Sequence, residues 1–147
     1  MVSWSAFAAR EGRATVACPF FLADEPLSSS REARPVPLGD FYQGQCSADP
    51  TAYRPNETEL RAWCNFGYAR GACPRFPATA SADAVCFAVA ADRDGEITVH
   101  FCLERDHRPG RHGSLVYLRG TGMVPPGDSG VNTLATAYVE AYRRRTR

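Results

Sequence analysis

Four cysteines in the first half of the chain are the residues whose types and spacing most clearly suggest chemistry. Cys18 and Cys73 are each followed by proline, and Cys46 and Cys64 lie between them. Four thiolates make a complete ligand set for a 4Fe–4S cluster or for a structural zinc ion. The sequence therefore raises a choice between these two centres, and a third alternative in which the cysteines are simply buried thiols.

The spacing and the neighbours of the four cysteines favour the cluster. Zinc sites usually contain a close pair such as Cys-x2-Cys, because a tight turn preorganises two thiolates, and this chain has no such pair. A four-iron cluster is larger than one ion, so dispersed ligands can reach its corners. A Cys-Pro pair also closes the cysteine run of bacterial ferredoxins, and the chain has two such pairs.

These residues together resemble a four-cysteine module of uncharacterised bacterial proteins. The resemblance covers residues 18–76, and its motifs are Cys18-Pro19-Phe20, then Cys46, then Cys64 in an aromatic stretch, then Cys73-Pro74-Arg75-Phe76. It implies that Cys18, Cys46, Cys64 and Cys73 act as one unit that binds a metal or an iron–sulfur cluster. It implies no particular reaction.

Composition limits the remaining possibilities. The 147 residues are 44% hydrophobic, which predicts one compact domain over residues 1–147 with a substantial core. The 17 basic residues nearly balance the 16 acidic ones, giving a net charge of +1, so we expect no nucleic-acid partner. We also expect no membrane insertion, because no apolar run is long enough to span a bilayer. The N-terminus does not resemble a signal peptide, which predicts a cytoplasmic protein with reduced thiols.

The elements that must position the cysteines differ between the two halves of the chain. Residues 1–80 read as loop-rich, with a polar, proline-containing loop over residues 28–37. One helix is predicted there, because Asn56 and Glu59 have the spacing of a capping box. Leu60, Trp63, Cys64 and Tyr68 would then share one helical face, and Gly67 or Gly71 would end the helix just before Cys73.

Residues 81–147 have regular patterns that predict a small antiparallel sheet and a C-terminal helix. Strands are predicted over residues 84–90 and 96–103, joined by a turn at residues 92–95, and a third strand is predicted over residues 114–119 after a loop at residues 107–112. Asp128 or Ser129 would cap the final helix. One face of that helix would carry an apolar stripe of Val131, Leu134, Ala135, Tyr138, Val139 and Tyr142. The predicted fold class is α+β, with a loop-rich, cysteine-ligated N-terminal half packed on this sheet and helix.

A second group of metal-capable residues lies on one face of the predicted hairpin. A three-residue loop would place Cys86 opposite Cys102, with Ala88 opposite His100. The side chains of Cys86, His100 and Cys102 have three alternative interpretations, which are core packing, a role beside the metal, and a separate metal site. The alternation of the hairpin assigns the other face to the core.

The functional prediction is one-electron transfer to or from a partner protein, or a cluster-stapled subunit of a larger redox complex. Four protein ligands leave no open iron for a substrate. We therefore predict no catalytic residues and favour a protein without enzymatic activity of its own. Trp63, Phe66, Tyr68 and Phe20 would shield the cluster from water, which affects its reduction potential. The alternative from another class is a zinc-stapled interaction domain without redox activity. Two catalytic alternatives use Cys64 with a histidine, or Asp106 with His107 as an acid–base pair.

Overall fold

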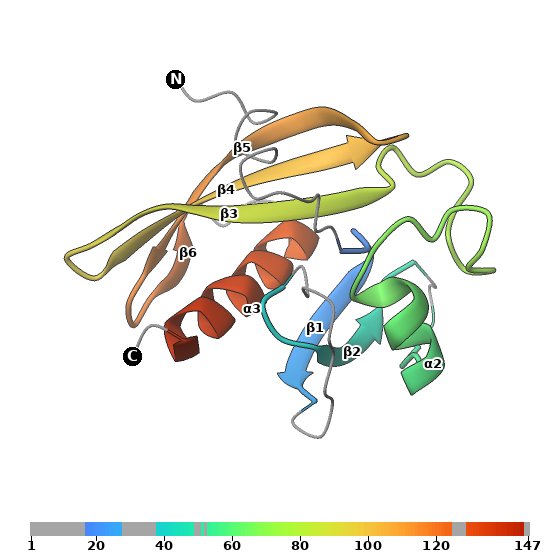
Figure 1. Ribbon diagram of the computed structural model, residues 1–147, viewed down its shortest axis with the longest axis horizontal. Helices are drawn as coiled ribbons and strands as arrows, with labels where there is room; N and C mark the ends of the chain where they lie inside the picture. The colour runs from blue at the N-terminus through green and yellow to red at the C-terminus, as the bar shows by residue number, and fades with distance from the viewer. Residues whose placement is uncertain (1–16, 28–37, 49–50, 52, 125–128, 146–147) are drawn as a thin grey trace.

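The computed structural model describes residues 17–27, 38–48, 51, 53–124 and 129–145. Within these residues the chain forms two antiparallel sheets and a long C-terminal helix (Figure 1). The predicted α+β class is therefore confirmed. The predicted loop at residues 28–37 and the predicted cap Asp128 lie outside the described residues.

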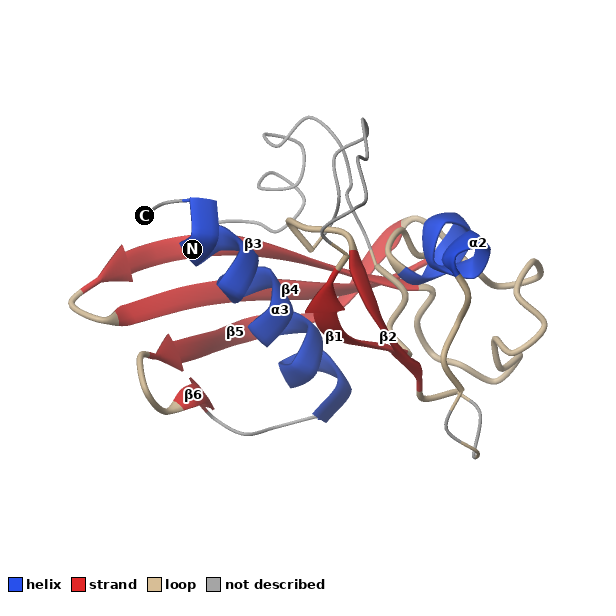
Figure 2. Cartoon of the chain, turned by 90° about the horizontal axis from the view of Figure 1, so that it is seen from below, coloured by secondary structure: helices blue, strands red, loops and turns tan. Residues whose placement is uncertain are grey.

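The larger sheet is a four-stranded meander that carries most of the second half. Its strands are β3 (Ala84–Arg93), β4 (Glu96–Arg105), β5 (Arg108–Leu118) and β6 (Gly122–Val124), paired in that order. Helix α3 (Ser129–Arg145) lies across one face of this sheet (Figure 2). The predicted apolar face of the hairpin and the stripe of α3 meet in the main core, which includes Val85, Val99, Phe101, Leu134 and Val139.

The register of the first hairpin is the predicted one. Cys86 pairs with Cys102 and Ala88 pairs with His100. The turn itself contains two residues, Asp94 and Gly95, both with positive φ, as a type I′ turn requires. A bulge between Val89 and Ala91 adds one residue to β3 and so restores the register that a three-residue loop would produce.

The predicted loop at residues 107–112 is wrong, because β5 begins at Arg108. Asp106 and His107 alone connect β4 to β5, and both have positive φ, which again corresponds to a tight hairpin turn. Arg105 pairs with Arg108 across this turn. The polar composition of the segment indicated a loop, but its residues are the exposed end of a long hairpin.

The smaller sheet was not predicted, and it organises the first half. It pairs β1 (Phe21–Pro26) with β2 (Tyr42–Cys46). A Cβ atom on Gly44 would lie 2.1 Å from the carbonyl oxygen of Leu22, so only glycine permits this close pairing of the two strands. The Tyr42 hydroxyl donates to the Ala137 carbonyl in α3 at 2.6 Å, which joins this sheet to the helix of the main core.

The predicted helix of the first half is short. Its capping box is confirmed, since the Asn56 side chain accepts from the Glu59 N–H and the Glu59 side chain accepts from the Asn56 N–H. The α-helical turn α2 (Glu57–Glu59) continues as a π-helical turn η1 (Leu60–Cys64). Tyr68 lies beyond it with a φ of 57°, so its predicted place on the helical face is wrong.

The helices described in this structure are also too short or too polar to cross a membrane.

Candidate metal centre

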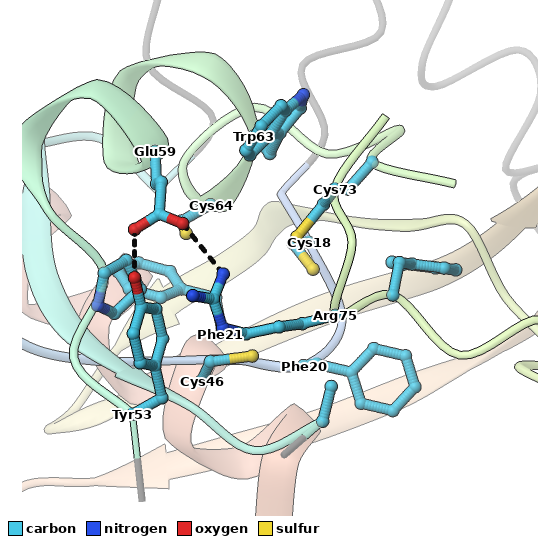
Figure 3. Close-up of a pocket in the computed structure, with 14 residues that line it drawn as sticks. Cys18, Phe20, Phe21, Cys46, Tyr53, Glu59, Trp63, Cys64, Cys73 and Arg75 are labelled. Atoms are coloured by element: carbon cyan, nitrogen blue, oxygen red, sulfur yellow. Dashed lines mark hydrogen bonds and ion pairs between the residues drawn. The ribbon is translucent and has the colours of Figure 1, made fainter. Parts of the chain in front are cut away.

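All four predicted ligand residues, Cys18, Cys46, Cys64 and Cys73, line a single pocket (Figure 3). They come from four separate segments of the first half. The pocket, with the space at its mouth, has a volume of about 400 Å³. Cys18 is buried, whereas the other three cysteines are partly exposed.

Two similar turns present Cys18 and Cys73. In each turn the cysteine is followed by proline, and its carbonyl accepts a hydrogen bond from the N–H of the phenylalanine three residues later, at 3.1 Å in both cases. Proline suits the second position of such a turn because its φ is already correct and it has no N–H to satisfy. The phenylalanine side chains that belong to these turns also meet, since the Phe20 and Phe76 rings pack edge to face at 5.4 Å.

Cys46 and Cys64 lie at the ends of regular elements. Cys46 is the last residue of β2, and its N–H donates to the Tyr53 carbonyl at 2.8 Å. Cys64 is the last residue of η1, and its carbonyl accepts from the Cys18 N–H at 3.2 Å. The backbone thus links Cys64 directly to Cys18, and pairing of Cys46 with Phe21 links β2 to the first Cys-Pro turn.

Asn65 fixes the position of its neighbour Cys64. Its side chain is fully buried and bonds to both backbone groups of Tyr42, accepting from the N–H at 3.0 Å and donating to the carbonyl at 2.9 Å. It also donates to the Leu60 carbonyl at 3.2 Å. The amide therefore joins the start of β2 to the end of η1. In the sequence, Asn65 stands out only as a polar residue between Cys64 and Phe66. Its partner Tyr42 is distant along the chain, so no local pattern indicates the contact.

The surroundings of Cys18 and Cys64 oppose the ionisation of these two thiols. Burial raises the pKa of Cys18 to about 12, although the nearby backbone N–H groups of Phe20 and Phe21 act in the opposite direction. Burial also raises the pKa of Cys64, and the charges of Cys18, Cys46 and Cys73 add to this effect. A bound cation would relieve the repulsion between them.

A charged network lies on the wall of the same pocket. The Arg75 guanidinium donates to Glu59 at 2.8 Å and lies over the Tyr53 ring at 3.4 Å from its centroid. Glu59 also accepts from the Tyr53 hydroxyl at 2.6 Å and from the Asn56 N–H at 3.0 Å. Burial acts to raise the pKa of Glu59, but these hydrogen bonds outweigh it and lower the pKa. The carboxylate is therefore ionised at neutral pH.

Only part of the predicted aromatic shield surrounds the pocket. Phe20 and Trp63 line it, together with Phe76. Phe66 packs against the main core instead. Tyr68 donates its hydroxyl to Glu104 and stacks on His107, with ring centroids 4.1 Å apart. The left-handed backbone of Tyr68 turns its side chain toward the β4–β5 hairpin, which is why the helical pattern placed it wrongly.

The second cysteine group does not line the pocket. Cys86 and Cys102 form a small buried cluster with Ala84, against which Tyr68 packs. His100 lies on the same face and its Nδ1 is 2.7 Å from the Ser114 hydroxyl. This arrangement favours core packing as the role of Cys86 and Cys102.

The catalytic alternatives are not assembled at the pocket. None of the three histidines, which all belong to the described residues, is among those that line it, so Cys64 is not paired there with a histidine base. Asp106 and His107 form an exposed turn, and the Asp106 N–H donates to Asp83 at 2.8 Å. The turn is thus held by structural contacts.

Across the described part of the chain, no group of three or more His, Cys, Asp or Glu side chains is arranged to hold one metal ion. The four thiols share a pocket without forming a single-ion site. Comparison of the chain with protein-family models, with curated proteins and with solved structures returned no match.

Proposed function

We propose that the protein binds one 4Fe–4S cluster through Cys18, Cys46, Cys64 and Cys73 and passes single electrons to and from a partner protein. The observation that carries the proposal is the convergence of these four thiols, from four segments, on one pocket. They are also the complete ligand set that such a cluster requires. A cluster bound there would supply a reversible one-electron centre.

The residues around the thiols fit this group. The aromatic side chains of Phe20, Trp63 and Phe76 limit the access of water, and backbone N–H groups lie close to the Cys18 sulfur. Hydrogen bonds to sulfur and solvent exposure are two of the features that set the reduction potential of a cluster. The Arg75–Glu59–Tyr53 network ties together the segments that carry Cys46, Cys64 and Cys73.

The exposure of the ligands supports electron transfer over a purely structural role. Cys46, Cys64 and Cys73 are partly exposed, so a partner protein could approach one side of the centre closely. With all four ligands supplied by the chain, no iron position remains open to a substrate. Electron exchange is then the chemistry that such a centre offers.

Metal and sulfide analysis of anaerobically purified protein tests the proposal. We expect about four iron atoms and about four acid-labile sulfides per chain, with brown protein. One zinc ion per chain without sulfide would replace the proposal with a zinc-stapled interaction domain. Folded protein that takes up neither metal would contradict both. Reversible one-electron reduction without loss of far-ultraviolet circular dichroism is expected for a carrier, whereas reduction that unfolds the chain would indicate a structural cluster.

A further inference from the structure

Arg75 occupies a distinctive position on the pocket wall. It is the third residue of the turn Cys73-Pro74-Arg75-Phe76, and the matching place in the other Cys-Pro turn is taken by Phe20. Both side chains line the pocket. The two turns have the same backbone hydrogen bond, but only the second carries a positively charged side chain that lines the pocket.

The guanidinium of Arg75 is held on two sides. Glu59 accepts one N–H at 2.8 Å, and the Tyr53 ring lies beneath the guanidinium plane, with the central carbon 3.4 Å from the ring centroid. The side chains of Arg75 and Glu59 are 25% and 15% exposed. Figure 3 shows Arg75 together with the four cysteines among the side chains that line the pocket. An arginine stacked and bonded in this way is fixed in orientation, and its charge is only partly screened by water.

Arg75 places a permanent positive charge on the wall of the pocket. A guanidinium has five N–H groups, and Glu59 receives one of them. Arginine keeps its charge at every physiological pH. A fixed cation and N–H donors beside four thiolates stabilise whichever state of the centre carries more negative charge.

We propose that Arg75 raises the reduction potential of the centre and that Glu59 opposes it, so the pair sets that potential. The inference rests on the proposed function. Reduction adds one electron from the donor protein, or from the electrode in a measurement, and breaks no bond. The cluster with its four thiolates then carries one more negative charge, which the Arg75 cation stabilises and the Glu59 carboxylate destabilises. Arg75 thus acts on the centre through its charge, and Glu59 and Tyr53 hold that charge in place.

Opposite charge changes at the two residues should shift the potential in opposite directions. We would measure midpoint potentials of anaerobic, cluster-loaded protein by voltammetry at one pH. Arg75→Met is expected to shift the potential negative, Glu59→Gln to shift it positive, and Arg75→Lys to stay near the unchanged protein. Arg54→Met is the matched control, because Arg54 forms an exposed ion pair with Asp24 outside the pocket, and no shift is expected.

A merely structural role predicts a different result. Loss of support for the pocket would move Arg75→Met and Glu59→Gln in the same direction, and that result would overturn the inference. A potential of Arg75→Met equal to that of the Arg54→Met control would do the same. If the Arg75→Met protein does not hold the cluster, the midpoint potential of the Glu59→Gln protein decides the test. A positive shift of that potential supports the inference, and no shift refutes it.

Iron and sulfide counts on each sample separate this test from the test of the proposed function. Unchanged protein without a cluster would refute the proposed function and the inference that rests on it. Cluster-loaded protein whose potential does not respond to the two charge changes would refute only the role of Arg75 and Glu59.

Discussion

The six cysteines fall into two groups that the structure treats differently. Cys18, Cys46, Cys64 and Cys73 surround a pocket, whereas Cys86 and Cys102 lie in the middle of neighbouring strands. In the first group, Cys18 and Cys73 lie in turns, and Cys46 and Cys64 are the last residues of β2 and η1. The second pair is packed against Ala84 and Tyr68. The surroundings of a thiol therefore depend on whether its cysteine lies inside a strand or at a turn or the end of an element.

This difference has a physical basis. Inside a sheet the register places each side chain against fixed neighbours, so a cysteine there is packed as a small apolar residue. Turns and element ends can direct several side chains at one space, because their backbones are held by hydrogen bonds outside any continuous ladder. A ligand site therefore develops more readily among the irregular segments of the first half.

The largest expected effect comes from removing the thiols that line the pocket. Alanine in place of Cys18, Cys46, Cys64 or Cys73 should abolish cluster binding or reduce it severely, because each change removes one of four ligands. Cys86→Ala and Cys102→Ala are the matched controls and should keep the iron and sulfide content of the unchanged protein. Metal analysis and the visible spectrum measure the cluster content of both sets of variants. Equal losses from the two groups would contradict the division between them.

A smaller effect is expected from the buried amide that supports the pocket. Asn65→Ala leaves the buried N–H and carbonyl of Tyr42 without their partner, and should lower the free energy of unfolding by about 3 kcal/mol. Cluster content should also fall, because Asn65 adjoins Cys64. Urea denaturation measures the first effect and iron analysis the second.

The control for this change is Gln43→Ala on the same strand, where an exposed side chain bonds to Glu25. That change should alter the free energy of unfolding by less than about 0.5 kcal/mol. An equally small effect of Asn65→Ala would show that the amide does not hold the two segments together.

The smallest expected effect on stability concerns Asp83, which bonds to the β4–β5 turn and does not line the pocket. Burial acts to raise the pKa of Asp83, but bonds from the Asp106 N–H and the Arg70 guanidinium outweigh it and lower the pKa. A lowered pKa stabilises the fold above the unfolded value, which is about 3.9, and this stabilisation is lost as the pH falls toward the folded pKa. Asp83→Asn should therefore cost about 2 kcal/mol at pH 7 and progressively less below about pH 4.

Urea denaturation at several pH values checks this dependence, and iron content at pH 7 should not change. Asp24→Asn, in an exposed ion pair with Arg54, is the control and should have an effect below about 1 kcal/mol. A loss of iron in Asp83→Asn would show that the pocket and the β4–β5 hairpin are coupled more closely than their separate contacts indicate.

Local patterns were the reliable part of the prediction. The capping box of Asn56 and Glu59, the pairing of Cys86 with Cys102 and the apolar stripe of α3 all involve residues that are close in sequence or joined by one turn. The errors have long-range causes. Strand β2 is held by Asn65 and by α3, and Tyr68 leaves the helix to reach Glu104. The extent of β5 was missed because its first residues are polar and exposed.

The sequence by itself determined the α+β class and the main hairpin and helix, and it predicted Cys18, Cys46, Cys64 and Cys73 as one set of candidate ligands. These depend on short-range periodicity and on residue type. Only the tertiary structure decided that the four thiols share a pocket, that Arg75 and Glu59 line it, and that Cys86 and Cys102 lie elsewhere. Each of these outcomes depends on contacts between segments far apart in the chain, and no local pattern encodes the direction in which those segments approach one another.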